Sequence, residues 1–393
     1  MNDVLPVELI QAILLRVPAR HLFPLKLVSK LWLSLISNPE FVELHLHRNS
    51  ALTPAFFFTE NSEKACLVDL HALFNEDATI GAAIKDVPIP FGKKKKEKKN
   101  PTTIYFEVLG SCRGFVFLHR KPHVIVVWNP VTGSCKQICY LYSYPHIFKR
   151  DRYFFGSILY GVGYDASNDD YLVVFTLKED RIDCFSLRKN SWMKINVEFP
   201  ISLTRFDTKP KGLFLNGGIH WLCYEAILMF DVREKSLSEI CLPPEQNSVG
   251  GASSNLVILD GCLALYYYEP YKTKIWVMKE YKVWSSWTLY VIRYRYFNAC
   301  IRPLCLSNGG DFIGLDSKDK ISKYNLEGEL LQRFQYYHND DVTNLFARYT
   351  LYTETLVTLP KKEKKWAKIR SRWRGLIAGG SFLARGQTSK ENN

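Results

Sequence analysis

The sequence of 393 residues has no apolar stretch long enough to cross a bilayer. Its segment Leu256–Tyr268 is interrupted by Asp260 and Gly261, whereas a membrane-spanning helix needs about 18 consecutive apolar residues. The N-terminus begins with Asn2 and Asp3 after the initiator and has no basic region, so a secretory signal is not expected. We therefore expect a soluble protein of the cytoplasm, the nucleus or both.

Closely spaced metal-ligand pairs are also scarce. The ten cysteines are spread along the chain, and the two closest pairs are Cys135 with Cys139 and Cys300 with Cys305. Neither pair has a second pair or histidines at zinc-finger spacing. A disulfide framework belongs to small secreted chains, which this is not. We expect reduced, buried thiols, no metal and no cofactor.

No combination of residues indicates catalysis. Gly161-x-Gly163 lacks the third glycine of a dinucleotide fingerprint, and Ser111 lacks the strand–turn–helix setting of a nucleophile elbow. The pair Asp169-Asp170 follows Ser167-Asn168, a combination typical of a hairpin turn. His220 lies in an apolar segment and is better explained as a hydrogen-bonded core residue. No catalytic residues are therefore predicted, and an enzymatic propeller has no support in the sequence.

The net charge of +13 is concentrated in two segments. Residues 93–99 hold six lysines and one glutamate, and residues 361–374 hold eight basic residues and one glutamate, so these segments carry twelve of the thirteen charges. The rest of the chain is nearly neutral, which argues against a general nucleic-acid-binding surface. The lysine-rich loop at 93–100 is either a solvated insertion or a nuclear-import signal.

The C-terminal segment 360–393 reads as a basic, partly disordered tail. Apolar residues from Trp366 to Ile377 recur at spacings of three and four among lysines and arginines. As a helix, this segment could lie on an acidic membrane or a partner, or rest on the rest of the protein. It could equally be loosely ordered.

Three short helical patterns occupy the N-terminal residues, which contain few charges. In the first, Leu9, Ile13 and Val17 recur at helical spacing, Pro6 suits a first turn and Pro18 ends the run. A second and a third pattern follow before Asn38-Pro39. So small an apolar module cannot bury all of its surface, and a remaining face should bind a partner.

The order and spacing of these residues resemble an F-box of the plant type. The shared pattern is Leu5-Pro6-x-x-Leu9-Ile10-x-x-Ile13-Leu14-x-Arg16-Val17-Pro18, then Leu22, Val28-x-Lys30-x-Trp32, Leu35-Ile36 and Pro39-x-Phe41. The resemblance implies docking on a Skp-type adaptor and, through it, on the cullin and RING subunits of an SCF ubiquitin ligase. The implied adaptor face and its supporting core comprise Leu5, Pro6, Leu9, Ile10, Ile13, Leu14, Val17, Pro18, Val28, Trp32, Leu35 and Ile36.

Four residues of this segment depart from the family pattern: Pro24, Leu27, Ser29 and Leu31. Pro24 matters most, because proline inside a helix costs about 3 kcal/mol but little in a first turn. We interpret it as a first-turn residue. Residues 38–47 are predicted to form a last helix, with Phe41 and Leu44 facing inward and with His45 and His47 at the surface or helix end.

From residue 52 the periodicity changes to short strands and turns, and a blurred repeat appears. Its aromatic anchors are 57, 45, 46 and 48 residues apart, a period typical of propeller blades: Trp128, Phe185, Phe230, Trp276 and Tyr324. Each unit is expected to begin with a glycine-containing strand near the axis, as at Gly110, Gly161, Gly217 and Gly261. The clusters Tyr266–Tyr268 and Trp284–Trp287 are either blade core or a ligand platform.

Several motifs in this region resemble the F-box-associated domain of plant F-box/kelch-like proteins. They are Gly110-Ser111-Cys112-x-Gly114, Trp128-Asn129-Pro130, Gly163-Tyr164-Asp165 and Tyr352-Thr353-Glu354-Thr355-Leu356. The expected fold is α+β and multidomain: a three-helix F-box at 2–47 and an all-β, kelch-like propeller of about six blades at 52–359. A composite blade would pair Phe56–Leu70 with Arg348–Leu359.

The resemblance implies a non-catalytic substrate-recognition adaptor of an SCF ligase that acts as a single copy and binds an unknown target protein. A propeller scaffold that binds nucleic acid or an acidic membrane through its basic tail is the alternative. Loss of binding at physiological salt would favour that alternative.

Overall fold

The protein is described by a computed structural model that covers residues 5–49, 55–59, 64–74, 83–90, 106–120, 124–139, 159–178, 181–199, 210–223, 225–244, 254–294, 300–317, 320–334 and 349–359. The chain divides into two units, Met1–Thr358 and Leu359–Asn393, and the helices and strands below all belong to the first. The predicted lysine-rich loop and basic tail lie outside the described residues. No helix among the described residues is long and apolar enough to cross a membrane.

Four helices form an N-terminal helical module. They are α1 (Val7–Leu14), α2 (Ala19–Leu25), α3 (Lys30–Ser37) and α4 (Pro39–Asn49). Pro6 and Pro18 stand immediately before α1 and α2, where a missing N–H leaves no hydrogen bond unmade. The Ser29 side chain caps α3 by accepting from the Trp32 N–H at 3.1 Å.

Pro24 corrects one expectation about this module. It is the sixth residue of the seven-residue α2 rather than a first-turn residue, because the helix already begins after Pro18. Past the first turn, a proline deprives the carbonyl four residues earlier of a donor. The helix ends one residue later, at Leu25, and turns joining Leu27 to Pro24 and Val28 to Leu25 follow.

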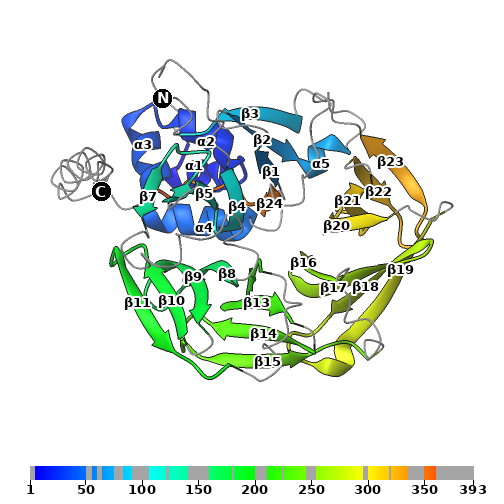
Figure 1. Cartoon of the computed structure of the whole chain (residues 1–393). Helices are drawn as coiled ribbons and strands as arrows, with labels where there is room; N and C mark the ends of the chain where they lie inside the picture. The colour runs from blue at the N-terminus through cyan, green and yellow to red at the C-terminus, as the bar shows by residue number, and fades with distance from the viewer. Residues whose placement is uncertain are drawn as a thin grey trace, which may run out of the picture. The chain divides into compact units, whose positions relative to one another are not determined.

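Six four-stranded antiparallel sheets follow in the described residues, which confirms the predicted helices-then-propeller fold class (Figure 1). Blade 1 contains β24 (Tyr349–Tyr352), β1 (Ala55–Thr59), β2 (Lys64–Asp69) and β3 (Ile84–Pro88); α5 (Leu70–Leu73) follows β2. Blade 2 contains β4 (Phe106–Cys112), β5 (Phe115–Arg120), β6 (Val124–Trp128) and β7 (Cys135–Cys139). Blade 3 contains β8 (Tyr160–Asp165), β9 (Asp170–Lys178), β10 (Arg181–Ser186) and β11 (Ser191–Asn196).

The remaining three blades repeat this order. Blade 4 contains β12 (Leu213–Leu215), β13 (Gly218–Leu222), β14 (Ala226–Asp231) and β15 (Leu237–Cys241). Blade 5 contains β16 (Asn255–Leu259), β17 (Cys262–Glu269), β18 (Lys272–Met278) and β19 (Trp287–Arg293), with the 3-10 turn η6 (Trp284–Ser286) before β19. Blade 6 contains β20 (Ile301–Leu306), β21 (Phe312–Asp316), β22 (Ile321–Tyr324) and β23 (Leu330–Phe334).

The five aromatic anchors of the repeat are structurally equivalent. Each lies on the third strand of its blade, namely β6, β10, β14, β18 and β22. Clusters of buried apolar side chains fill the spaces between blades 1 and 2, 3 and 4, 4 and 5, 5 and 6, and 6 and 1. Blades 2 and 3 meet through Phe115 and Tyr171, whose ring centroids lie 4.9 Å apart. Each blade therefore buries its two faces against its neighbours.

The predicted composite blade is confirmed. The strand β1 pairs with β2 on one side and with β24 on the other, in the register Ala55↔Asp69 and Ala55↔Tyr352. The last described strand therefore completes the first blade, and the hydrogen-bonding edge of β1 is covered.

The prediction that the first strand of each blade contains a glycine is correct at two of the four positions named. Gly110 and Gly161 do lie on the first strands β4 and β8, and a Cβ on Gly161 would stand 2.4 Å from Ile219 Cγ2. Gly217 and Gly261 instead occupy turns before the second strands, with φ of +76° and +73°. Glycine is required there because the left-handed backbone is unfavourable for other residues.

Candidate functional site

The core of the helical module consists of side chains that face inward from all four helices. The buried residues of this cluster include Leu14, Ala19, Leu22, Ile36 and Phe41. Leu356, in the segment after β24, completes it. Val131, from the turn between β6 and β7, packs on the same cluster. The helical module therefore shares its core with the propeller.

Two expectations about α4 are wrong. Leu44 is 53% exposed rather than inward-facing, and His45 is fully buried rather than at the surface. The ring of His45 lies beside Phe41, and its Nε2 stands 2.8 Å from the Val17 carbonyl oxygen. Burial lowers the pKa of His45. The helix is rotated so that His45, and not Leu44, closes the core.

A large apolar surface of the helical module nevertheless remains exposed. We call these ten side chains the exposed apolar surface: Leu5, Val7, Leu9, Ile13, Phe23, Leu27, Val28, Leu31, Leu33 and Leu44. Leu9 and Ile13 are 52% and 54% exposed, and one helical turn separates them on α1, so they share a face. Burying a leucine or isoleucine completely contributes about 1.5–3 kcal/mol, so covering this surface would give a partner substantial binding energy.

The structure separates the predicted adaptor-face residues into three groups. Exposed are Leu5, Pro6, Leu9, Ile13 and Val28. Partly buried are Ile10, Val17, Pro18, Trp32 and Leu35. Fully buried are Leu14 and Ile36. Leu14 and Ile36 therefore support the fold of the module, whereas the exposed group is available for contact.

Arg20 joins the helical module to the propeller. Its guanidinium contacts Asp69 at 2.8 Å and Glu354 at 3.4 Å, and its backbone N–H donates to Glu354 at 3.3 Å. Both carboxylates are buried, and burial outweighs the attraction of Arg20, so the pKa of Glu354 is raised. Arg20 therefore connects α2 to the end of β2 and to the segment after β24.

Arg113 makes a second connection between these parts. It lies in the turn between β4 and β5, forms an ion pair with Glu43 of α4 and stacks over the Tyr164 ring with its Cζ 4.1 Å from the centroid. Sequence reasoning missed both arginines, since their partners are 334 and 70 residues away. The one sequence feature that pointed to these contacts was Glu354, which lies in the motif Tyr352–Leu356 shared with the family.

These contacts place the helices at one end of the blades. The turns after β4 and β6, the end of β2 and the segment after β24 all contact the helical module, and Figure 1 shows the helices overlying blades 1 and 2. In an antiparallel blade the first and third connections emerge at the same end. The opposite end of the ring, where β4, β8, β12, β16, β20 and β24 begin, is left free of the described helices.

The residues weighed for catalysis or ligand binding have structural partners. The Ser111 hydroxyl donates to the Leu351 carbonyl, and Asp170 accepts from Ser186 and from the Arg188 N–H. His220 is fully buried between the Leu213 carbonyl and the Tyr281 hydroxyl, as expected of a core histidine.

The aromatic clusters divide between core and surface. Tyr267 and Trp287 are buried between blades 4 and 5, whereas Trp284 is 52% exposed.

All ten cysteines are free, but only five are buried, so the expectation of buried thiols is half right. Burial raises the pKa of Cys112 to about 12, which makes it unreactive. Among the described residues no cluster of histidine, cysteine and carboxylate side chains could hold a metal.

Comparison with known proteins agrees with this architecture. A family model described as "F-box domain" matches residues 3–44, and one described as "F-box associated beta propeller domain" matches residues 56–322. F-box protein CPR1 of Arabidopsis thaliana is 30% identical over 72% of this chain and 71% of that protein. Two other Arabidopsis thaliana proteins are also similar. F-box protein At4g22390 is 27% identical over 72% of each chain, and F-box/kelch-repeat protein At3g23880 is 28% identical over 78% of this chain and 83% of that protein.

The first matched segment runs from before α1 into α4, the second runs from β1 into β22, and the relatives align with most of this chain. This combination supports a general role in substrate recognition within SCF ubiquitin ligases. The chain belongs to the plant F-box proteins that carry an F-box-associated β-propeller.

Proposed function

We propose that this chain is a non-catalytic substrate-recognition subunit of an SCF ubiquitin ligase. Its helical module docks on a Skp-type adaptor, and the propeller binds a target protein. The observation that carries the proposal is the exposed apolar surface, which persists although the module shares its core with the propeller. Within this surface Leu9 and Ile13 share one face of α1, and exposed apolar patches on soluble proteins mark interaction sites.

The contact set proposed for the adaptor is the exposed group Leu5, Pro6, Leu9, Ile13 and Val28, with the partly buried residues beside it. Ile10, Trp32 and Leu35 pack against the module core and would hold the contact residues in place. Leu14 and Ile36 act only through the fold.

The mechanism proposed is proximity. Arg20 and Arg113 hold the helical module against one end of blades 1 and 2, which leaves the other end of the ring for a target. A fixed geometry between the adaptor and the target raises the effective concentration of target lysines near the ligase's active site. The chain itself contributes no reacting group. A location in the cytoplasm or nucleus follows from this role.

Adaptor capture tests this proposal. The variant Leu9→Asp/Ile13→Asp places two charges on the exposed apolar surface without touching buried core, so adaptor co-purification should fall at least tenfold while the thermal unfolding midpoint is unchanged. The matched control is Leu331→Asp on β23, since Leu331 is an exposed leucine of the propeller (47% exposed). Undiminished capture of the adaptor by the double variant would contradict the assignment.

A further inference from the structure

A cavity of about 620 Å³ lies among the inner strands of the ring. Residues of β4, β8, β12, β16, β20 and β24 all line it, so every blade contributes to its wall. Ligand cavities in proteins are commonly about 300–1,000 Å³. The cavity is therefore large enough for a small molecule.

The charged side chains on the described wall are both cationic: Lys211 and Arg302. No aspartate or glutamate is among the described residues that line the cavity. The nearby carboxylate of Glu107 does not line the cavity and lies 3.7 Å from the His119 ring. The pKa of Tyr160, which does line the cavity, is raised by burial and, to a smaller extent, by the negative charge of Glu107. The cavity thus has an excess of positive charge.

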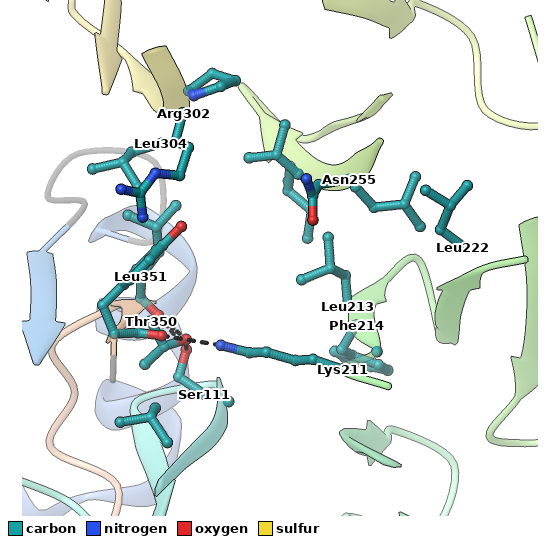
Figure 2. Close-up of a pocket in the computed structure, with 18 of the residues that line it drawn as sticks. Ser111, Lys211, Leu213, Phe214, Leu222, Asn255, Arg302, Leu304, Thr350 and Leu351 are labelled. Atoms are coloured by element: carbon teal, nitrogen blue, oxygen red, sulfur yellow. Dashed lines mark hydrogen bonds between the residues drawn. The ribbon is translucent and has the colours of Figure 1, made fainter. Parts of the chain in front are cut away.

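Lys211 precedes β12 and extends across the cavity, as Figure 2 shows. Its Nζ donates to the Tyr349 carbonyl oxygen at 3.0 Å, on the far side of the ring. Burial lowers the pKa of Lys211 to about 8. A carbonyl oxygen neutralises none of the ammonium charge, so an anion beside Lys211 would restore the interaction that burial removes.

Several polar residues of the cavity lie at the starts of the inner strands. Tyr160, Asn255 and Tyr349 are the first residues of β8, β16 and β24, Lys211 comes just before β12, and Arg302 is the second residue of β20. The two cations reach the cavity from blades 4 and 6.

The rest of the wall is mainly apolar. Valine, leucine and isoleucine side chains from all six blades line it, including Val108, Val162, Leu256, Ile258 and Leu304. Hydroxyl groups of Ser111 and Thr350, which are 3.3 Å apart, add further polar contacts. Such a wall suits a ligand with an apolar body and one anionic group.

We propose that this cavity binds a small organic anion, in which a carboxylate or phosphate contacts Lys211 and Arg302 and an apolar body packs on the aliphatic wall. The site is separate from the exposed apolar surface and does not depend on adaptor docking. Charge-assisted hydrogen bonds from ammonium and guanidinium groups recognise both kinds of anion.

Isothermal titration of the full chain with three naphthyl probes tests the proposal. 2-Naphthoate and 2-naphthyl phosphate should each bind at least about tenfold more tightly than 2-naphthalenemethanol, since a hydrogen bond to a charged group is worth about 1.5–3 kcal/mol. The stronger of the two anions identifies the preferred group. Equal affinity for the alcohol, or no binding of either anion, overturns the proposal.

Two substitutions locate the binding. Lys211→Met should remove the preference for the anions, whereas Lys211→Arg should keep it. Lys136→Met is the matched control, because the Lys136 Nζ also donates to a carbonyl oxygen, that of Leu187 at 2.7 Å, but does not line the cavity. Binding at the exposed apolar surface would be insensitive to Lys211, so an unchanged preference in Lys211→Met overturns the assignment.

A footprint on the unmodified chain covers the case in which Lys211→Met does not fold. Acetylation of Lys211 by acetic anhydride, followed by mass spectrometry, should slow in the presence of the better anion and not in that of the alcohol. Acetylation of Lys136 should be unaffected by either. Equal acetylation of Lys211 with and without the anion contradicts the proposal.

Discussion

At the scale of single residues, His220 illustrates how burial sets chemistry. It is fully buried, with Nδ1 3.1 Å from the Leu213 carbonyl oxygen and Nε2 2.7 Å from the Tyr281 hydroxyl. Burial lowers its pKa to about 4, although the hydrogen bond to Leu213 opposes the shift. The imidazole is therefore neutral in the folded protein at pH values where it would be protonated in the unfolded chain.

This difference predicts a pH dependence of stability. Between pH 6.5 and 4 the unfolded chain binds more protons than the folded one, so the free energy of unfolding falls as pH is lowered through that window. His220→Gln keeps a donor and an acceptor but does not titrate, and should lose about 1–2 kcal/mol less between pH 7 and pH 5 than the wild type. Urea unfolding at the two pH values measures this. The exposed His47→Gln is the control, and equal losses in His220→Gln and wild type would contradict the prediction.

Gly314 is a second residue whose role only the packing reveals. A Cβ there would stand 2.3 Å from the backbone oxygen of Arg302 in the neighbouring strand. Since backbone cannot move aside, Gly314→Ala should destabilise the protein by about 1–3 kcal/mol in chemical denaturation. Gly309→Ala is the matched control, because its nearest neighbours are 3.8 Å away, and it should change stability by less than about 0.5 kcal/mol. Similar stabilities of the two variants would refute the packing argument.

At the scale of elements, the junction between helices and blades is decided by contacts between distant segments. The short helices were predicted from periodicity and proline positions. The orientation of α4 was not, because Leu44 and His45 are adjacent and periodicity alone permits a rotation of one residue. The ring of Phe41 and the carbonyl of Val17 decide it in favour of His45.

The Arg20 junction can be tested by a double-mutant cycle. Arg20→Met leaves the buried carboxylates of Asp69 and Glu354 without their cation and should cost about 2–3 kcal/mol, somewhat less than for a fully buried pair because Arg20 is 28% exposed. Combining it with Glu354→Gln should cost less than the sum of the two single changes. The control Arg233→Met breaks an exposed pair with Glu234 and should be nearly neutral. Strict additivity in the cycle would show that Arg20 and Glu354 are not coupled.

At the scale of the whole molecule, the ring depends on the last described strand. The inner strand β24 belongs to blade 1, although almost 300 residues separate it from β1. Blades 1 and 6 share a buried core that closes the ring. Loss of β24 would therefore expose the edge of β1 and open the ring.

Two truncations test this closure. A chain that ends at residue 359 retains β24 and should unfold cooperatively at a temperature close to that of the full chain. A chain that ends at residue 348 lacks β24 and should aggregate or lose its cooperative transition in calorimetry. If the shorter chain unfolds like the longer one, the composite blade does not hold the ring together.

The sequence by itself determined the F-box at the N-terminus and the repeating blades, because helical periodicity, turn residues and a 45–57-residue spacing are local signals. It also specified the apolar residues from which the proposed adaptor surface and its core are drawn. The tertiary structure decided which of these residues are exposed, through the shared core with Leu356 and Val131. It likewise brought Lys211 and Arg302 to one cavity and Arg20 to Glu354, because contacts between residues far apart in the chain depend on how the blades close.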